Sequence, residues 1–533
     1  MDRRTFLTST GRIAALAAAG GFTTPAISQR AAARTVRLAP HADLTNFDPV
    51  WTPAYIGRNA AVLVWDMLYG IDASLTPQRQ MIEAEEVSSD GLTWTFRLRP
   101  GLKFHDGEPV LARDAVASID RWSVRDSMGQ MLRAIQNELV VDDDRTFRWA
   151  LKRPFPRMLF ALGKISTPCC FVMPARIAAT DPFKLINEYV GSGPMRFVRN
   201  EWVPGSRAAF ERFSDYIPRL EEPSWLAGGK RIIADRVEWI VMPDAGTAFA
   251  ALQTGEVDWW ELVIPDLVPK LRTKRDLMVD INDPRGLVGV LAMNHVFPPF
   301  NDVRARRAIL MAMNQEDYMR AFAGDDPGLW KPMPGYFTPG TPLYNEEGGE
   351  ILKGPRNLDA AKRLFAESGY AGERIILMAA QDLPHHKAWG DVTHDLLQRL
   401  GVNADYAAVD WGTVAARRVQ KKAPEQGGWH MYHTSPSGVD MATPTNVLTR
   451  SDGGMPLNGW SKNPLVEAEI EAWFDAKNLD EEKAVARRLN KAALEHVVYA
   501  PVGWCLRHYA WRRSLTGVMP GPLPFFWGVS KTV

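Results

Sequence analysis

The chain has 533 residues, 46% of them hydrophobic and 23% charged, which is typical of globular proteins and long enough for two or more domains. Its formal net charge of +1 gives no bulk attraction to nucleic acid or to an anionic membrane, so neither is expected as a partner. Three cysteines are too few for a disulfide framework. The adjacent Cys169 and Cys170 are predicted to be unpaired and buried, with a strained vicinal disulfide or a redox pair as alternatives.

The N-terminal region has the pattern of an export signal. Residues 3–7 (RRTFL) are a twin-arginine motif, residues 13–22 are apolar and free of acidic side chains, and residues 26–28 place small residues at a cleavage site. We therefore predict a twin-arginine signal peptide at residues 1–28 and a soluble, periplasmic mature protein. The alternative is a short N-terminal helix of the mature fold.

Beyond this region, hydrophobic periodicity predicts β and α segments that alternate along the chain. Residues 35–38 are expected to form a first strand. Residues 93–99 alternate apolar and polar side chains, as do residues 147–151, which is the pattern of strands with one buried face. The sequence thus belongs to the α/β class.

Three later segments have the 3.6-residue period of helices. Asn357 is a predicted N-cap for a helix that ends before Gly369. Apolar residues between 465 and 474 form a second stripe, with Leu465 among them. Acidic residues 480–482 suit the first turn of a third helix because of the helix dipole. These stripes are interpreted as core, and no cofactor is assigned to them.

Sequence motifs of enzymes are missing. The chain contains no phosphate-binding Gly-x-x-x-x-Gly-Lys-Ser/Thr loop, no Gly-x-Ser-x-Gly nucleophile elbow and no His-Glu-x-x-His zinc helix. His385 and His386 are predicted to lie in a solvated loop. His430 and His433 fall in a segment rich in Gly, Ser and Pro, where metal ligation stays open but no metal is assigned.

Several segments, in order along the chain, resemble the family 5 extracytoplasmic solute-binding proteins, which include dipeptide-, oligopeptide-, glutathione- and nickel-binding members. The matching segments are residues 65–70 (WDMLYG), 88–107 (SSDGLTWTFRLRPGLKFHDG), 191–194 (GSGP), 202–205 (WVPG), 244–258 (DAGTAFAALQTGEVD) and 300–308 (FNDVRARRA). Most of these residues are structural, such as Asp302, a predicted helix N-cap.

The resemblance implies a two-lobed periplasmic-binding-protein fold, of the class with an extra domain inserted near the N-terminus. The first lobe would comprise residues 34–48, 189–288 and 501–533, the inserted domain 49–188 and the second lobe 289–500. Residues 286–294 would be one hinge strand. The lobes would close over a ligand that touches both of them.

The resemblance also implies an anchor for the ligand. Residues 440–446 (DMATPTN) align with a family segment whose first aspartate accepts the α-ammonium group of a peptide, which assigns this role to Asp440. The alternative is an Asx-turn ahead of Pro444. Met441, Thr443 and Thr445 depart from the family pattern, which leaves amines other than standard peptides open. Weaker candidates for ligand contacts are Trp411, Trp429, Tyr432, His433 and Asn46.

Three functions follow from these observations. The first is a periplasmic, monomeric binding protein that delivers a short peptide or related amine to an inner-membrane ABC permease. The second is a binder of a nickel chelate on the same fold, with His433 as a ligand. The third is a secreted hydrolase, against which the missing nucleophile motif argues. A partner for a ligand carboxylate cannot be chosen among the many arginines.

Overall fold

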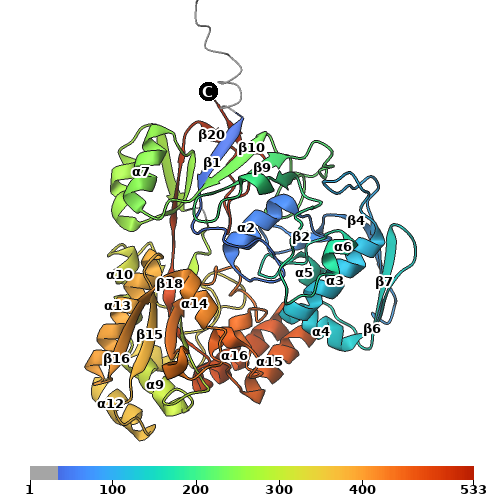
Figure 1. Cartoon of the computed structure of the whole chain (residues 1–533). Coiled ribbons are helices and arrows are strands. Elements are labelled where there is room, and N and C mark those ends of the chain that lie inside the picture. The colour runs from blue at the N-terminus through green and yellow to red at the C-terminus, as the bar shows by residue number, and fades with distance from the viewer. Residues whose placement is uncertain (1–33, 282, 533) are drawn as a thin grey trace, which may run out of the picture.

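A computed structural model describes residues 34–281 and 283–532, which form two lobes and a smaller domain beside the first (Figure 1). The predicted signal peptide, residues 1–28, lies outside the described residues. Each lobe is built on one mixed sheet, and the smaller domain on an antiparallel one. Along residues 34–281 and 283–532, no helix is both long and apolar enough to cross a membrane.

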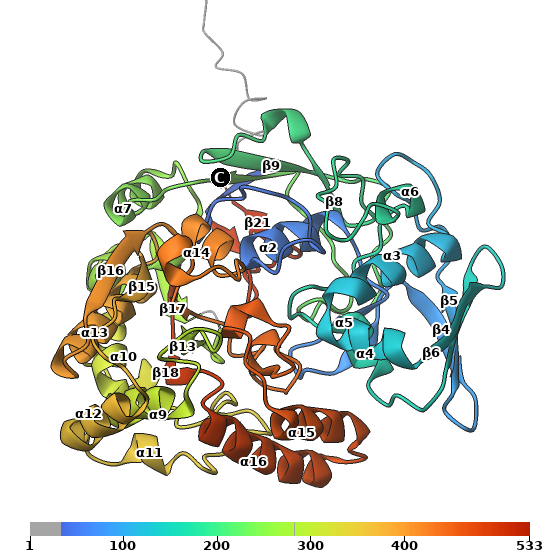
Figure 2. The same cartoon turned by 60° about the horizontal axis from the view of Figure 1, so that its bottom comes forward.

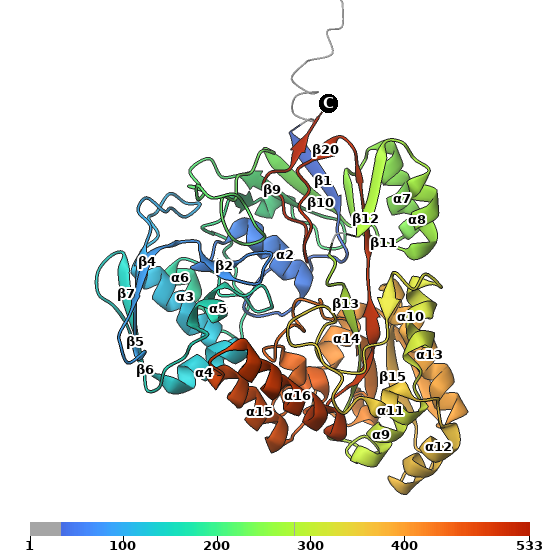
Figure 3. The same cartoon turned by 180° about the vertical axis from the view of Figure 1, so that it is seen from behind.

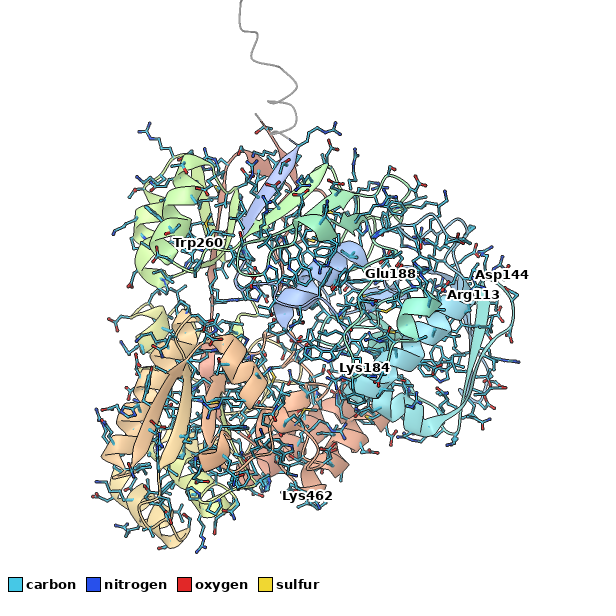
Figure 4. The ribbon with its side chains drawn as sticks, viewed as in Figure 1. Arg113, Asp144, Lys184, Glu188, Trp260 and Lys462 are labelled. Carbon is cyan, nitrogen blue, oxygen red and sulfur yellow. The ribbon has the colours of Figure 1, made fainter. Side chains whose placement is uncertain are left out.

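The first lobe contains a seven-stranded sheet of order β12-β19-β11-β1-β10-β9-β8. Its strands are β1 (Thr35–Ala39), β8 (Met195–Phe197), β9 (Arg207–Arg212), β10 (Arg236–Ile240), β11 (Trp259–Val263), β12 (Leu277–Ile281) and β19 (His508–Arg512). Helices α7 (Ala245–Thr254) and α8 (Val268–Arg272) cover the face that carries Trp260 (Figure 4). Helix α2 (Tyr55–Val64) packs on the opposite face, where Val36 and Leu38 point, so it belongs to the first lobe although the inserted domain was predicted to begin at residue 49. The alternation along β1 therefore places Val36 and Leu38 against α2, and Ala39 on the face covered by α7 and α8.

The second lobe contains a six-stranded sheet of order β14-β18-β13-β17-β15-β16. Its strands are β13 (Leu287–Met293), β14 (Trp330–Lys331), β15 (Ile375–Ala380), β16 (Ala404–Val409), β17 (Met431–Thr434) and β18 (Ala500–Cys505). One face packs on α10 (Gln315–Ala323) and α13 (Pro384–Arg399), and the other on α14 (Trp411–Arg417). The lobe is completed by α9 (Val303–Ala312), α11 (Glu350–Lys353), α12 (Leu358–Glu367), α15 (Pro464–Asp475) and α16 (Leu479–His496).

The inserted domain is a four-stranded antiparallel sheet of order β4-β5-β7-β6, covered by helices. Its elements are β4 (Ile82–Val87), β5 (Thr93–Leu98), β6 (Gln136–Val141), β7 (Thr146–Leu151), α3 (Ala112–Arg125), α4 (Ser127–Ile135), α5 (Met158–Gly163) and α6 (Ala175–Ala178). The turn between β6 and β7 contacts the start of α3, where the Ala112 amide donates a hydrogen bond to the Asp144 carbonyl. Asp144 and Arg113, the residue after Ala112, lie close together in Figure 4. The short hairpins β2 (Tyr69–Ile71) with β3 (Pro77–Arg79) and β20 (Leu515–Thr516) with β21 (Ser530–Lys531) complete the described strands.

Three ion pairs between almost fully buried side chains fix the inserted domain and its connections to the first lobe. Arg121 contacts Asp48 at 2.7 Å, Lys164 contacts Asp126 at 2.7 Å, and Lys230 contacts Asp66 at 2.8 Å. Removing one member of such a pair leaves a buried charge without a partner, which costs about 3–5 kcal/mol. The Arg121–Asp48 and Lys230–Asp66 pairs therefore join the inserted domain to the first lobe, and the Lys164–Asp126 pair joins two segments within the inserted domain.

The chain passes between the two large sheets at two places, residues 283–286 after β12 and residues 506–507 after β18. The predicted lobe boundaries at residues 288 and 501 lie a few residues away from these crossings. The difference arises because β13 and β18 pair with each other along the second sheet, with Leu287 opposite Cys505. The segment predicted as a hinge strand, residues 286–294, is therefore mostly a strand of the second lobe.

Most predicted elements are present. Strand β5 and strand β7 are neighbours in register, and Asn357 and Asp302 cap α12 and α9 through their side chains. Leu465 is an exception, because it is 68% exposed although it was expected in a core stripe. Cys169 and Cys170 are unpaired and buried, as predicted.

Candidate functional site: an interlobe cavity at Asp440

Asp440 lies in the loop that follows β17, where the second lobe meets a crossing segment. The Gly438 amide donates to the Gly286 carbonyl at 2.8 Å, and the Asp440 amide donates to the Ser437 carbonyl at 3.0 Å. A Cβ on Gly438 would lie 1.9 Å from the Arg285 carbonyl oxygen. Only glycine allows this approach, so the sequence at position 438 sets the position of Asp440 against the crossing.

The carboxylate of Asp440 is buried, and only one of its two oxygens has a hydrogen-bond partner in the described residues. Its side chain is 3% exposed, and Oδ2 accepts a hydrogen bond from the Tyr55 hydroxyl. Oδ1 is buried and has no hydrogen-bond partner within the described residues. Burial raises the pKa of Asp440, although the nearby Arg58, the Tyr55 hydrogen bond and Lys164 act in the opposite direction. An unsatisfied oxygen on a buried carboxylate is suited to accept a hydrogen bond from a cationic ligand.

Tyr55 connects the two lobes at this point. It is the first residue of α2 in the first lobe, and its hydroxyl also accepts a hydrogen bond from the Ser437 amide at 3.0 Å. The guanidinium of Arg58 lies over the Tyr55 ring, 4.5 Å from its centroid. Arg58 is itself held by Asn59 Oδ1 at 3.0 Å and by the Ile165 carbonyl at 3.3 Å. Tyr55 is thus held in place from the first lobe while it contacts two residues of the second.

A cavity of about 320 Å³ adjoins Asp440, between the inserted domain and the second lobe. Its walls include Phe160, Lys164 and Ile165 from the inserted domain, and Val439, Asp440 and Trp473 from the second lobe. The volume is at the lower end of the range for small-ligand sites. A mixture of apolar walls with a few charged groups is also typical of such sites.

Helices α15 and α16 lie beside the inserted domain (Figures 2 and 3), and Trp473 of α15 and Glu482 of α16 line the cavity. Phe155 stacks on Phe474 with 5.7 Å between ring centroids, and the Arg157 guanidinium lies 4.0 Å from the Trp473 ring. Arg157 also pairs with Glu482 at 2.9 Å. The inserted domain and the second lobe therefore contact each other directly beside the cavity.

His385 and His386 are buried at the start of α13, so the prediction of a solvated loop is wrong. Both Nε2 atoms lie 2.9 Å from the Ser435 hydroxyl. Burial lowers the pKa of both rings, to about 3 for His385, so both are neutral at pH 7. One hydroxyl can donate only one hydrogen bond, so one histidine accepts it and the other donates to the oxygen. The tightly packed apolar neighbours Phe322 and Trp389 explain the burial.

Arg418 is a buried cation near these histidines. It is 8% exposed, and its guanidinium lies 4.9 Å from the Trp411 ring and 5.8 Å from the Tyr432 ring. Its Nε has no hydrogen-bond partner in the described part of the chain, and no ion pair joins it to a described carboxylate. A buried guanidinium whose Nε donor is unused is suited to bind an anionic group.

Of the other predicted site residues, Trp411, Trp429 and Tyr432 lie in one apolar cluster on a face of the second sheet, with 4.9 Å between the Trp429 and Tyr432 rings, whereas His433 and Asn46 lie elsewhere. Tyr432 and His433 point to opposite faces of the second sheet, since they pair with Ala292 and Leu291, which belong to different apolar clusters. Trp429 is fully buried and donates to the Arg418 carbonyl at 3.2 Å. His433 lies 2.8 Å from the Thr393 hydroxyl.

Trp411 and Asn46 lie in more open positions. The Trp411 ring is half-buried and lies 4.8 Å from the His386 ring. Asn46 follows β1, and its Oδ1 is buried without a partner among the described residues. Tyr55 beside Asp440, and the separate buried group of His385, His386 and Arg418, were not expected. No local pattern distinguishes these residues, because their contacts join separate elements of the fold.

The described residues contain no cluster of three or more His, Cys, Asp or Glu side chains that could hold a metal ion. His433, the ligand considered for a nickel chelate, has its Nε2 beside Thr393 in the core between the sheet and α13. Neither a cluster of ligating side chains nor the position of His433 supports a metal site in the part of the chain that the structure describes.

Comparison with known proteins adds to this geometry. The family model of bacterial extracellular solute-binding proteins, family 5 (middle region), matches residues 76–455. The chain belongs to this family. A protein of Sinorhizobium fredii named "Probable peptide ABC transporter periplasmic-binding protein" is 36% identical over 528 residues, which cover 97% of this chain and 98% of that protein. A glutathione-binding protein of Pectobacterium atrosepticum is 29% identical over 453 residues, 82% of each chain.

Solved structures of the same architecture confirm the predicted two-lobed α/β fold of this family member. The periplasmic binding protein AgaA of A. tumefaciens R10, in complex with agropinic acid, has a TM-score of 0.78 at 21% identity and covers 94% of this chain and 99% of its own. A dipeptide-binding protein of Pseudoalteromonas sp. SM9913, in complex with Met-Leu, has a TM-score of 0.75 at 18% identity, with coverages of 93% and 100%. By name, these relatives and neighbours are binding proteins.

Proposed function

We propose that this family 5 protein is the periplasmic substrate-binding component of an ABC importer and that it binds a short peptide or a related amine-bearing solute between its lobes. The observation that carries the proposal is the buried carboxylate of Asp440, whose Oδ1 lacks a partner in the described residues beside a cavity of about 320 Å³. A ligand ammonium would supply the missing hydrogen bond to Oδ1 and would add positive charge to that of the nearby Arg58 and Lys164. The name of the Sinorhizobium fredii relative, 36% identical over nearly the full chain, supports a peptide as the ligand.

Binding would proceed by closure of the lobes. Asp440 belongs to the second lobe and Tyr55 to the first, so a ligand held at Asp440 favours the state in which both lobes surround it. No bond in the ligand is made or broken, and the protein is accordingly not an enzyme. It would act as a monomer in the periplasm after export by the twin-arginine route, and an inner-membrane ABC permease would receive the ligand.

Arg418 is the candidate partner for a carboxylate of the ligand. Its guanidinium is buried against Trp411 without a described carboxylate, and it influences the pKa of His386, whose ring contacts Ser435. Ser435 and Asp440 lie in the same loop after β17. An ammonium at Asp440 and a carboxylate at Arg418 would together recognise a zwitterion, which is the form of a peptide at pH 7.

Two measurements test the proposal. Native mass spectrometry of the protein as purified would identify a retained ligand. Calorimetric titration with dipeptides, glutathione and opine acids, followed by the same titrations with Asp440→Asn, would show whether binding depends on the carboxylate. Binding of an uncharged solute that is equally strong in the variant would refute an amine ligand, and turnover of any solute would favour an enzyme.

A further inference from the structure

The hydrogen bond from Tyr55 occupies one of the two carboxylate oxygens of Asp440 and leaves the other for a ligand. Oδ2 receives the Tyr55 hydroxyl, and Oδ1 remains without a partner in the described residues. The phenol serves as the donor, because burial raises the pKa of Tyr55 well above its ordinary value and keeps it protonated. The carboxylate therefore offers one oxygen, not two, to a ligand.

The position of Tyr55 is set by groups on both sides. From the first lobe, Arg58 lies 4.5 Å above its ring, and Ile56 and Ala60 of the same helix are buried against the first sheet. From the second lobe, the Ser437 amide donates to the hydroxyl at 3.0 Å. Val439 of the second lobe also joins the apolar cluster under the first sheet. The hydroxyl can make these contacts only while the two lobes are together.

We propose that Tyr55 is a positioning and specificity-determining residue that completes the Asp440 anchor on closure and leaves only Oδ1 to accept from the ligand. This inference rests on the proposed amine ligand. It adds that primary and secondary ammonium groups, which both present a charged N–H, are accepted, whereas an uncharged amide nitrogen is rejected. It also adds that the Tyr55 hydroxyl stabilises the closed state, with or without a ligand.

The first experiment needs no ligand. Small-angle X-ray scattering is recorded for the full mature chain, stripped of ligand by guanidinium chloride and refolded, as wild type, Tyr55→Phe and Tyr406→Phe. Tyr406 is a matched control, because its hydroxyl donates to Asp391 at 2.6 Å on the surface of the second lobe. We expect a larger radius of gyration for Tyr55→Phe only. Equal radii for all three proteins would overturn the role of Tyr55 in closure.

The second experiment uses Met-Leu, N-methyl-Met-Leu and N-acetyl-Met-Leu in calorimetric titrations. We expect the first two to bind the wild type within threefold of each other and the acetylated peptide not to bind. Tyr55→Phe should weaken Met-Leu at least tenfold, mainly through faster dissociation, because a buried carboxylate oxygen loses its donor. The inference would be overturned if N-methylation of Met-Leu lowered its affinity for the wild type more than tenfold. It would also be overturned if Tyr55→Phe bound Met-Leu with an affinity within twofold of the wild type.

The two proposals fail in different ways. If the wild type binds Met-Leu and Asp440→Asn does not, while Tyr55→Phe behaves as wild type, only the role of Tyr55 is refuted. If the wild type binds none of the three peptides, the peptide ligand is refuted, and the scattering experiment still decides whether Tyr55 holds the lobes together.

Discussion

Asp440→Asn should have opposite effects on binding and on stability. The substitution keeps the shape of the side chain and removes its charge. Loss of one member of a buried, hydrogen-bonded charge pair costs about 3–5 kcal/mol, so affinity for an amine-bearing ligand should fall at least about 100-fold. The ligand-free protein should melt at the same temperature or higher. Burial raises the pKa of Asp440, which means that ionisation at pH 7 destabilises the folded state.

The pH dependence provides a further check on the same residue. Protonation of Asp440 removes the charge that an ammonium requires, so affinity should decline as the pH falls through a pKa that lies above the ordinary value of 3.8. The stability contribution has the reverse sign. A raised pKa in the folded state stabilises the protein most at low pH, and this contribution is lost as the pH rises through that pKa.

Isothermal titration calorimetry at pH 7 and thermal unfolding of the ligand-free protein measure the two effects. Asp391→Asn is the surface control, since Asp391 accepts a hydrogen bond from Tyr406 and also pairs with Lys387, an exposed ion pair whose loss costs about 1 kcal/mol or less. The reasoning is refuted if Asp440→Asn binds within threefold of wild type, or if its melting temperature drops by several degrees while that of Asp391→Asn is unchanged.

Three more predictions concern the support of the site and the fold. Gly438→Ala should weaken ligand binding at least tenfold in calorimetric titration, because its Cβ would lie 1.9 Å from the Arg285 carbonyl oxygen. In the control Gly354→Ala, the new Cβ has no neighbouring atom within 4 Å, so this variant should bind the ligand as the wild type does. Asp48→Ala should lower the free energy of unfolding, measured with denaturant, by about 3–5 kcal/mol because it leaves the buried Arg121 unpaired. Asp325→Ala, which removes an exposed pair, should lower it by about 1 kcal/mol or less. Equal losses would contradict a stabilising role of the buried pair. Lowering the pH from 7.5 to 5 should reduce stability, because the pKa values of His385 and His433 are lowered to about 3 and the unfolded chain takes up protons that the folded chain excludes. His433→Gln should reduce this pH dependence, and an unchanged slope would show that His433 does not contribute.

Local sequence patterns predicted individual elements well. The alternation in residues 93–99 and 147–151 corresponds to β5 and β7, and Asn357 and Asp302 cap helices as expected. These features depend on neighbours along the chain. Leu465 was misplaced for the same reason, since periodicity gives a face of α15 but does not show which edge of that face stays in solvent.

The site was predictable only in part. The position of Asp440 could be inferred because it lies in a contiguous stretch similar to other family members, but its role as an amine anchor remains a prediction. Its partner Tyr55 is 385 residues away, and no spacing connects them. His385 and His386 appeared polar and loop-like, yet the burial of both rings is decided by Ser435 and by aromatic residues from other elements. Contacts across lobes depend on the tertiary arrangement, which periodicity does not encode.

The two crossings have a consequence for how the protein could be taken apart. Residues 287–505 are one uninterrupted stretch that carries the whole second sheet, and its first and last residues are strand partners. A short linker from residue 286 to residue 506 would therefore bypass that half without stretching the chain. The excised segment would begin and end at paired residues of neighbouring strands, so its termini would lie side by side, which suits it to separate expression and to circular permutation.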